Sequence, residues 1–188
     1  MLETILLSCA AFIGTNIDDL FINTLFFTDA PSEARRIALG KYLGMGILTG
    51  ISILGASGLR LLAFRWLWLL GLVPVALGLR EAYHAFNPSD DDQPATRPSG
   101  AIWLSVTLIT IANGADNIGV YIPLFTGFAP WQTLTAACVF AIMTGLSCLF
   151  AKQLSTLSAL QHFLDRHRRF INPVIYILLG LYILLRSH

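Results

Sequence analysis

Long apolar runs follow one another along almost the whole chain, and they constrain its fold more than any other feature. Only 12% of the 188 residues are charged and the mean hydropathy is +0.68, whereas soluble domains carry about 25% charged residues. A helix needs ~20 apolar residues to cross a bilayer. Runs of that length predict six transmembrane helices, near residues 4–27, 38–59, 66–86, 101–126, 130–151 and 170–187.

We therefore expect an all-α, multi-pass protein of the plasma (inner) membrane, with the lipid bilayer as its surroundings. The spans leave no room for a soluble catalytic domain, so its chemistry must take place within the membrane. The net charge of +1 is too small to indicate a nucleic-acid partner. Cys9, Cys138 and Cys148 all fall in apolar runs and are expected to be free, buried thiols. Glu3 stands where a signal peptide would be basic, so the first span should be retained.

Basic residues between the spans predict the orientation of the chain, because excess positive charge stays on the cytoplasmic side. Nine of the twelve Lys and Arg residues fall on one side of the expected spans, which makes both termini extracytoplasmic. Lys41 and Arg80 lie near the cytoplasmic ends of their spans, where their side chains are expected to extend to the membrane surface. The nine are Arg35, Arg36, Lys41, Arg80, Arg97, Lys152, Arg166, Arg168 and Arg169.

A proline-rich acidic connection, NPSDDDQPATRPSG at residues 87–100, has almost nothing apolar to bury and is expected to be a flexible cytoplasmic linker. It separates residues 1–86 from residues 101–188, and each part holds three of the expected spans. An odd number of spans makes the second part enter the membrane from the opposite side. This is the inverted-repeat plan of many transporters.

The acidic segments of the two halves also align. GTNIDDLFI in the first span can be laid over ANGADNIGV in the fourth, which pairs Asp18 with Asp116 and Asp19 with Asn117. Asp18 and Asp116 each lie about 4 Å from the middle of their oppositely directed spans. The two spans are therefore expected to bring their polar groups together near the centre of the bilayer.

Each of these spans carries acids and amides where a charge costs several kcal/mol. Within each span, three of these residues share one helical face at spacings of three and four. In the fourth span, Gly114 and Gly119 weaken the helix, and Pro123 removes the hydrogen bond that the Gly119 carbonyl would accept. The first face holds Asn16, Asp19 and Asn23, and the second holds Asn113, Asp116 and Asn117.

Such a set of groups has two interpretations. Protonated carboxyl groups can join helices by hydrogen bonds, or ionised carboxylates can bind a cation. Three acids in pseudo-symmetric positions favour the cation, because intramembrane acids are usually functional. Carboxylate, amide and backbone oxygens suit a divalent ion, and these stripes hold no thiolate to select a softer metal.

The second span also carries Gly40-x-x-x-Gly44 and Gly46-x-x-x-Gly50, a pattern that lets helices approach closely. The helix that packs against this pattern can be the first span or a helix of a second copy of the chain. A homodimer is therefore one alternative. The segment QHFLDRHRRF, with His162 and His167, is expected to be a basic loop at the lipid head groups.

IANGADNIGVYIPLF, at residues 111–125, resembles the characteristic segment of the cadmium resistance transporter family, a branch of the lysine-exporter superfamily. GTNIDDLFIN and LGKYLG are similar to that family's first and second spans, and the resemblance covers essentially the whole chain. It implies a small exporter of Cd2+ and other divalent cations that gives metal resistance, not an enzyme, with no bound cofactor. By position, the metal ligands would be Asn16, Asp18, Asp19, Asn113, Asp116 and Asn117.

We expect alternating access, in which two three-helix halves rock around a midplane site. Protons are the expected coupling ion, because a metal binds ionised carboxylates and thus excludes protons from them. Alternatives are an exporter of Mn2+, Ca2+ or an amino acid on the same fold, and a passive cation channel. An intramembrane aspartyl protease is disfavoured, because NGAD stands where such enzymes have G-x-G-D.

Overall fold

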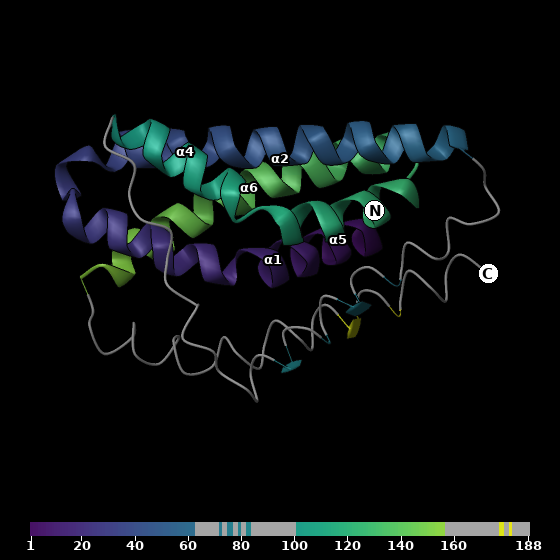
Figure 1. Cartoon of the computed structure of the whole chain (residues 1–188), viewed down its shortest axis with the longest axis horizontal. Helices are drawn as coiled ribbons and strands as arrows, with labels where there is room; N and C mark the ends of the chain where they lie inside the picture. Colours follow the sequence, from purple (N-terminus) through teal and green to yellow (C-terminus); the bar gives the residue numbers. More distant parts are fainter. Residues whose placement is uncertain are drawn as a thin grey trace.

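The computed structural model describes residues 1–62 and 101–156 and a few isolated positions beyond them, without the side chains of Asp18 and residues 60–62. The described residues form helices joined by short turns, with no strand among them (Figure 1). The all-α prediction is confirmed for this part of the chain. The helices are α1 (Leu2–Asp29), η1 (Pro31–Glu33), α2 (Ala34–Leu62), α4 (Ile102–Ala112), α5 (Ala115–Thr126) and α6 (Pro130–Leu154).

Four of the six expected spans correspond to described helices. Pro31–Leu59 and Pro130–Leu154 are each long and apolar enough to cross a membrane, and α1 would make a third as one bent span. At 11 and 12 residues, α4 and α5 are each too short to cross ~30 Å of hydrocarbon alone. Together they occupy the expected fourth span.

The other predicted features fall outside the described residues. They are the linker, the basic loop with its two histidines, and nearly all of the third and sixth spans. The count of six spans, the inverted arrangement and the orientation of the termini therefore stay predictions.

Hydroxyl side chains within these helices are satisfied by the helices themselves. Ser8 donates to the Thr4 carbonyl at 2.7 Å, and Thr144 donates to the Phe140 carbonyl at 2.7 Å. A hydroxyl bonded to the carbonyl one turn earlier needs no water. Serine and threonine are thus compatible with spans that must satisfy their polar groups internally.

The helices pack so that α5 and α6 lie between α1 and α2 (Figure 1). Gly40 and Gly44 of α2 make close contact with α4, the fourth span rather than the first. A Cβ atom on Gly40 would lie 2.3 Å from the Trp103 carbonyl oxygen, and one on Gly44 would lie 2.7 Å from Thr110. Nothing in the described part of the chain lies within 4 Å of a Cβ built on Gly46 or Gly50.

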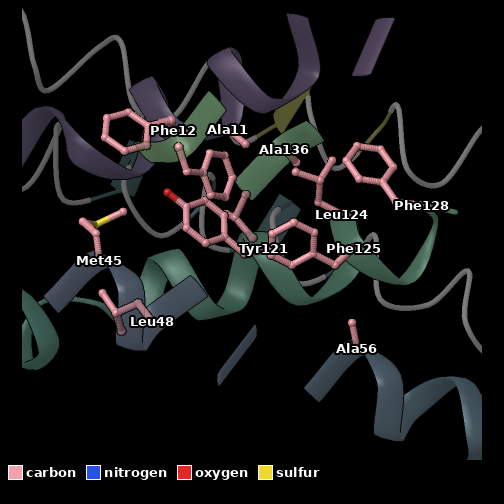
Figure 2. Close-up of a cluster of buried hydrophobic side chains, with 12 residues drawn as sticks. Ala11, Phe12, Met45, Leu48, Ala56, Tyr121, Leu124, Phe125, Phe128 and Ala136 are labelled. Carbon is pink, nitrogen blue, oxygen red and sulfur yellow. The ribbon is translucent and has the colours of Figure 1, made fainter. Parts of the chain in front are cut away.

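Buried apolar side chains form two clusters, and every long helix contributes to both. Tyr121 lies inside the first cluster (Figure 2), and its ring packs at a tilt against Phe140, with ring centroids 4.3 Å apart. The first cluster comprises Ala11, Phe12, Met45, Leu48, Ala56, Val120, Tyr121, Leu124, Phe125, Phe128, Ala136 and Phe140. The second comprises Phe26, Phe27, Ile37, Val106, Ile109, Cys148 and Ala151.

A polar layer separates the two clusters along each helix. Its members lie between first-cluster and second-cluster residues of the same helix or broken span, and all are buried. Apolar side chains alone could pack these helices, and buried polar groups within a membrane are costly. The polar layer is therefore the candidate functional region. The polar layer consists of Asn16, Asp19, Lys41, Asn117 and Thr144.

The cysteines only partly follow the prediction. All three are free, and Cys148 is buried, but Cys9 is half-buried and Cys138 is exposed. The expectation that Cys138 is buried is wrong, because it lies on the outer face of α6, away from the packed helices. An apolar residue in a membrane span can face lipid as readily as protein, so hydropathy alone could not distinguish the two.

Candidate metal site

The fourth span is broken inside its acidic segment. α4 ends at Ala112, Asn113 and Gly114 form a turn, and α5 begins at Ala115. Gly114 faces Leu48 of α2 so closely that a Cβ there would lie 2.4 Å from the leucine side chain. The chain can therefore turn here against α2, whereas α5 continues through Pro123.

This break corrects the expectation that Asn113, Asp116 and Asn117 share one helical face. Asn113 lies in the turn and is exposed, Asp116 is half-buried, and Asn117 is completely buried. Residues share a helical face only within one continuous helix. The turn gives Asn113 a different direction from the α5 side chains that follow it. Only the α5 residues Asp116 and Asn117 are directed toward the core.

The first-span face is buried as predicted, with Asn16, Asp19 and Asn23 at most 5% exposed. α1 bends by 59° between its Leu2–Ile17 and Asp19–Asp29 portions. Both spans with acidic segments thus depart from a straight helix at those segments. The side chain of Asp18 lies outside the described residues.

Asn16 connects the first span to the fourth. Its Nδ2 lies 3.1 Å from Asn117 Oδ1 and 3.1 Å from the Tyr121 hydroxyl. Thr15 Oγ1 is 2.9 Å from that same hydroxyl. The structure therefore brings amides of the two aligned segments into direct contact, and Tyr121 places its ring in the first apolar cluster and its hydroxyl in the polar layer.

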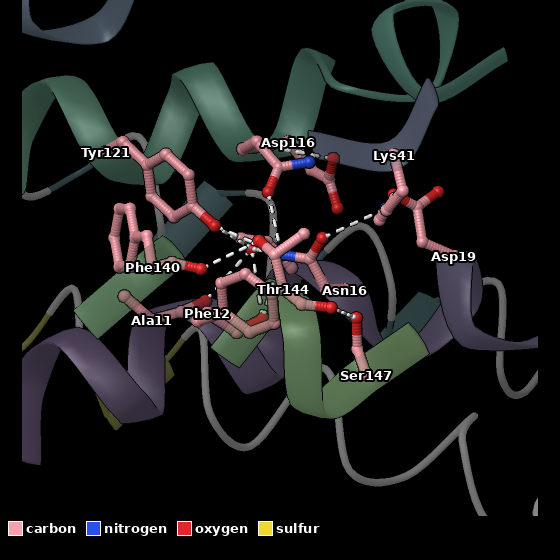
Figure 3. A network of polar contacts seen from close by, with 12 residues as sticks. Ala11, Phe12, Asn16, Asp19, Lys41, Asp116, Tyr121, Phe140, Thr144 and Ser147 are labelled. Atoms are coloured by element: carbon pink, nitrogen blue, oxygen red, sulfur yellow. Dashed lines mark hydrogen bonds and ion pairs between the residues drawn. The ribbon is translucent and has the colours of Figure 1, made fainter. Parts of the chain in front are cut away.

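Asp116 lies in the first turn of α5, where the positive end of the helix dipole favours a carboxylate. Its Oδ1 accepts a hydrogen bond of 2.8 Å from the Asn117 backbone N–H. Asp116 and Asp19, one from each aligned segment, belong to the same network of polar contacts (Figure 3). On the other side of the break, the C-terminal end of α4 is favourable for a cation.

The position of Lys41 also differs from the prediction. Lys41 was expected to extend to the membrane surface, but it is only 1% exposed and forms an ion pair with Asp19. Its Nζ also lies 3.5 Å from Asn16 Oδ1 (Figure 3). α2 begins at Ala34, so Lys41 lies about 10 Å along the helix at 1.5 Å per residue. A counter-ion at that depth stabilises the ammonium without water.

The polar layer offers oxygen atoms of the kind that bind divalent cations, from carboxylates and amides. Within the described part of the chain, no three His, Cys, Asp or Glu side chains gather closely enough to hold a metal ion. Two buried amide nitrogens, Asn23 Nδ2 and Asn117 Nδ2, make no hydrogen bond to the described residues. Buried polar groups are usually paired, so Asn117 of the polar layer and Asn23 of the same α1 face as Asp19 provide more hydrogen-bonding groups than packing needs.

Two residues that contact the acids and amides of the site, Tyr121 and Lys41, were not predicted as part of it. The sequence contains a weak indication of each. Tyr121 lies four residues after Asn117 and so on the same helical face. Lys41 is a lone cation inside the apolar run LGKYLGMGILTG, a position that could have indicated a buried counter-ion.

The comparison with known proteins gives one family. None of the curated proteins and none of the solved structures compared with the chain matches it. Residues 12–188 match the family described as Cad, cadmium resistance transporter, and this match includes both acidic segments, Lys41 and Tyr121. The chain therefore belongs to the cadmium resistance transporter family.

Proposed function

We propose that this protein exports divalent heavy-metal cations, with Cd2+ as the first candidate, by alternating access in the plasma membrane. The observation that supports this most is the buried layer in which Asn16 of a bent first span contacts Asn117 of a broken fourth span. Broken helices with polar groups at membrane depth are typical of transporter binding sites. The family is one of transporters rather than enzymes.

The proposed ligands are the acids and amides of the two aligned segments. Asp19 and Asp116 supply charge, and amide oxygens complete the set. Asn113 would join from the turn, where the half-helix α4 ends. The proposed set is Asn16, Asp18, Asp19, Asn113, Asp116 and Asn117.

Moving a divalent cation outward against an inside-negative potential of 100 mV costs about 4.6 kcal/mol, at about 2.3 kcal/mol per charge. Inward proton movement can offset this cost. A carboxylate binds either a proton or the metal, so sharing one set of acids between the two ions would couple their flows. We propose proton antiport on this basis.

Cd2+ uptake into everted membrane vesicles tests the site. We expect Asp116→Asn to lower the initial uptake rate about tenfold or more, because a binding carboxylate is lost. Asp29→Asn is the matched control, since Asp29 lies exposed at the end of α1, and it should retain uptake. Equal rates for Asp116→Asn and the wild type at equal protein levels would reject Asp116 as a ligand.

The same vesicles test coupling. With an acidic interior, adding Cd2+ should release protons, and a protonophore should reduce Cd2+ uptake. Uptake that follows only the Cd2+ gradient, at rates far above those of a carrier, would indicate a passive channel instead. Proton release on addition of Mn2+, Ca2+ or an amino acid, but not of Cd2+, would assign another substrate on the same fold.

A further inference from the structure

We propose that Lys41 is a tethered cation that competes with the transported metal for Asp19, and so sets how tightly the metal binds. This inference rests on the proposed function, because it takes Asp19 as a ligand of the cargo. It assigns a role to a side chain outside the two acidic segments.

The ammonium of Lys41 already occupies a cation position. Its Nζ pairs with Asp19 and lies 3.5 Å from Asn16 Oδ1. Both oxygens belong to the proposed ligand set, and all three residues are at most 5% exposed. A divalent ion that needs these oxygens must take a position next to, or in place of, the ammonium.

The charges around Lys41 make this competition strong. Asp19 of α1 faces it directly, and Asp116 of α5 belongs to the same network of polar contacts (Figure 3). Like charges repel far more in a buried site than in water. Because both cations would share the Asp19 carboxylate, the ammonium and a divalent cargo cannot both remain against Asp19 without strong repulsion.

The competing cation is held by a scaffold separate from Asp19. Gly40, next to Lys41, contacts the α4 backbone, and Thr107 of α4 donates to the Gly40 carbonyl at 3.0 Å. Among the described residues, the Lys41–Asp19 pair is the only ion pair that joins α1 to α2. Arrival of the metal would thus break a connection between these helices, and departure would restore it. Without metal, the Lys41 ammonium neutralises the Asp19 carboxylate.

Direct Cd2+ binding to the purified full-length protein in detergent tests the proposal. Lys41→Met should bind Cd2+ about tenfold more tightly than the wild type, because the competing charge is gone. Lys41→Arg keeps a cation and should stay near the wild-type affinity. Lys152→Met is the matched control, since Lys152 is exposed at the end of α6, and should leave the affinity unchanged. If Lys41 only stabilised the fold, its replacement would weaken Cd2+ binding. A gain in affinity therefore indicates that Lys41 competes with the metal.

A second measurement uses the wild-type protein and does not depend on a variant that folds. The chain contains two lysines, Lys41 and Lys152. Nitrogen-labelled lysine should give two side-chain ammonium signals in nuclear magnetic resonance spectra, and Lys152→Met assigns them. Cd2+ should shift the Lys41 signal and leave the Lys152 signal in place.

The outcomes distinguish this proposal from the function on which it rests. Cd2+ that binds the wild type without moving the Lys41 signal, or binds folded Lys41→Met no more tightly, overturns the tethered cation and leaves the transporter proposal intact. Failure of Cd2+ to bind the wild type and every variant overturns both.

Discussion

At the scale of residues, the chain buries a complete ion pair where a membrane protein could have used apolar side chains. A buried pair contributes little net stability over apolar residues of similar size, but removing one partner leaves an uncompensated charge. Lys41 and Asp19 therefore depend on each other for stability, whatever their role in transport.

This dependence gives a stability prediction. Asp19→Asn should lower the free energy of unfolding by about 3 kcal/mol, because the Lys41 ammonium stays buried without its counter-ion. The double variant Asp19→Asn with Lys41→Met should recover most of the loss. Denaturant titration in mixed micelles measures both. A single variant as stable as the wild type would show that the ammonium finds another partner.

The sequence revealed the acids and amides of this layer but not the ion pair. Asn16, Asp19 and Asn117 stand out because polar residues are rare in apolar runs. Lys41 was placed at the membrane surface because a long side chain near the end of a span can extend in either direction. Which direction it takes depends on what α1 offers at the same depth, and this contact joins residues 22 positions apart.

At the scale of elements, the contact between α2 and α4 is built on missing side chains. Gly40 allows the α4 backbone to approach so closely that no Cβ fits between them. Close packing of this kind supports helix association in membranes, where the hydrophobic effect between helices is absent.

The two glycine pairs of α2 give a matched comparison. Gly40→Ala should destabilise the protein by about 1–3 kcal/mol, because its Cβ meets a backbone oxygen that cannot easily move. Gly46→Ala adds the same atom where the described residues leave open space, and should change stability little. Unfolding midpoints in one detergent compare them. Equal losses would mean that helix propensity or lipid contacts, rather than the α2–α4 contact, decide the effect.

Hydropathy predicted the helices that the structure describes, but not the break in the fourth span. The residues at 101–126 predicted one apolar span weakened by Gly114, Gly119 and Pro123, without indicating which of the three would break it. The turn falls at Asn113 and Gly114, where Leu48 of α2 packs against the glycine, and α5 continues through Pro123. The position of a break is decided by the neighbouring helix, which the local sequence does not contain.

At the scale of the whole molecule, two apolar clusters enclose one polar layer to which the first, second, fourth and fifth expected spans contribute. The proposed transport mechanism requires the metal to bind in this layer. The first span bends and the fourth span breaks at their acidic segments, and the Lys41 ammonium already contacts two oxygens of the first span. These features make the layer the natural place for a cation.

An anomalous-scattering map of the full-length protein with Cd2+ tests this claim most directly. We expect one strong peak beside the polar layer, about 2.3–2.6 Å from carboxylate oxygens of Asp19 and Asp116, as for other cations of this size. The Lys41 ammonium should have moved away from Asp19 in the same crystals. Peaks found only elsewhere, at the acidic linker of residues 87–100 or at the histidines His162 and His167, with the layer unchanged, would contradict it.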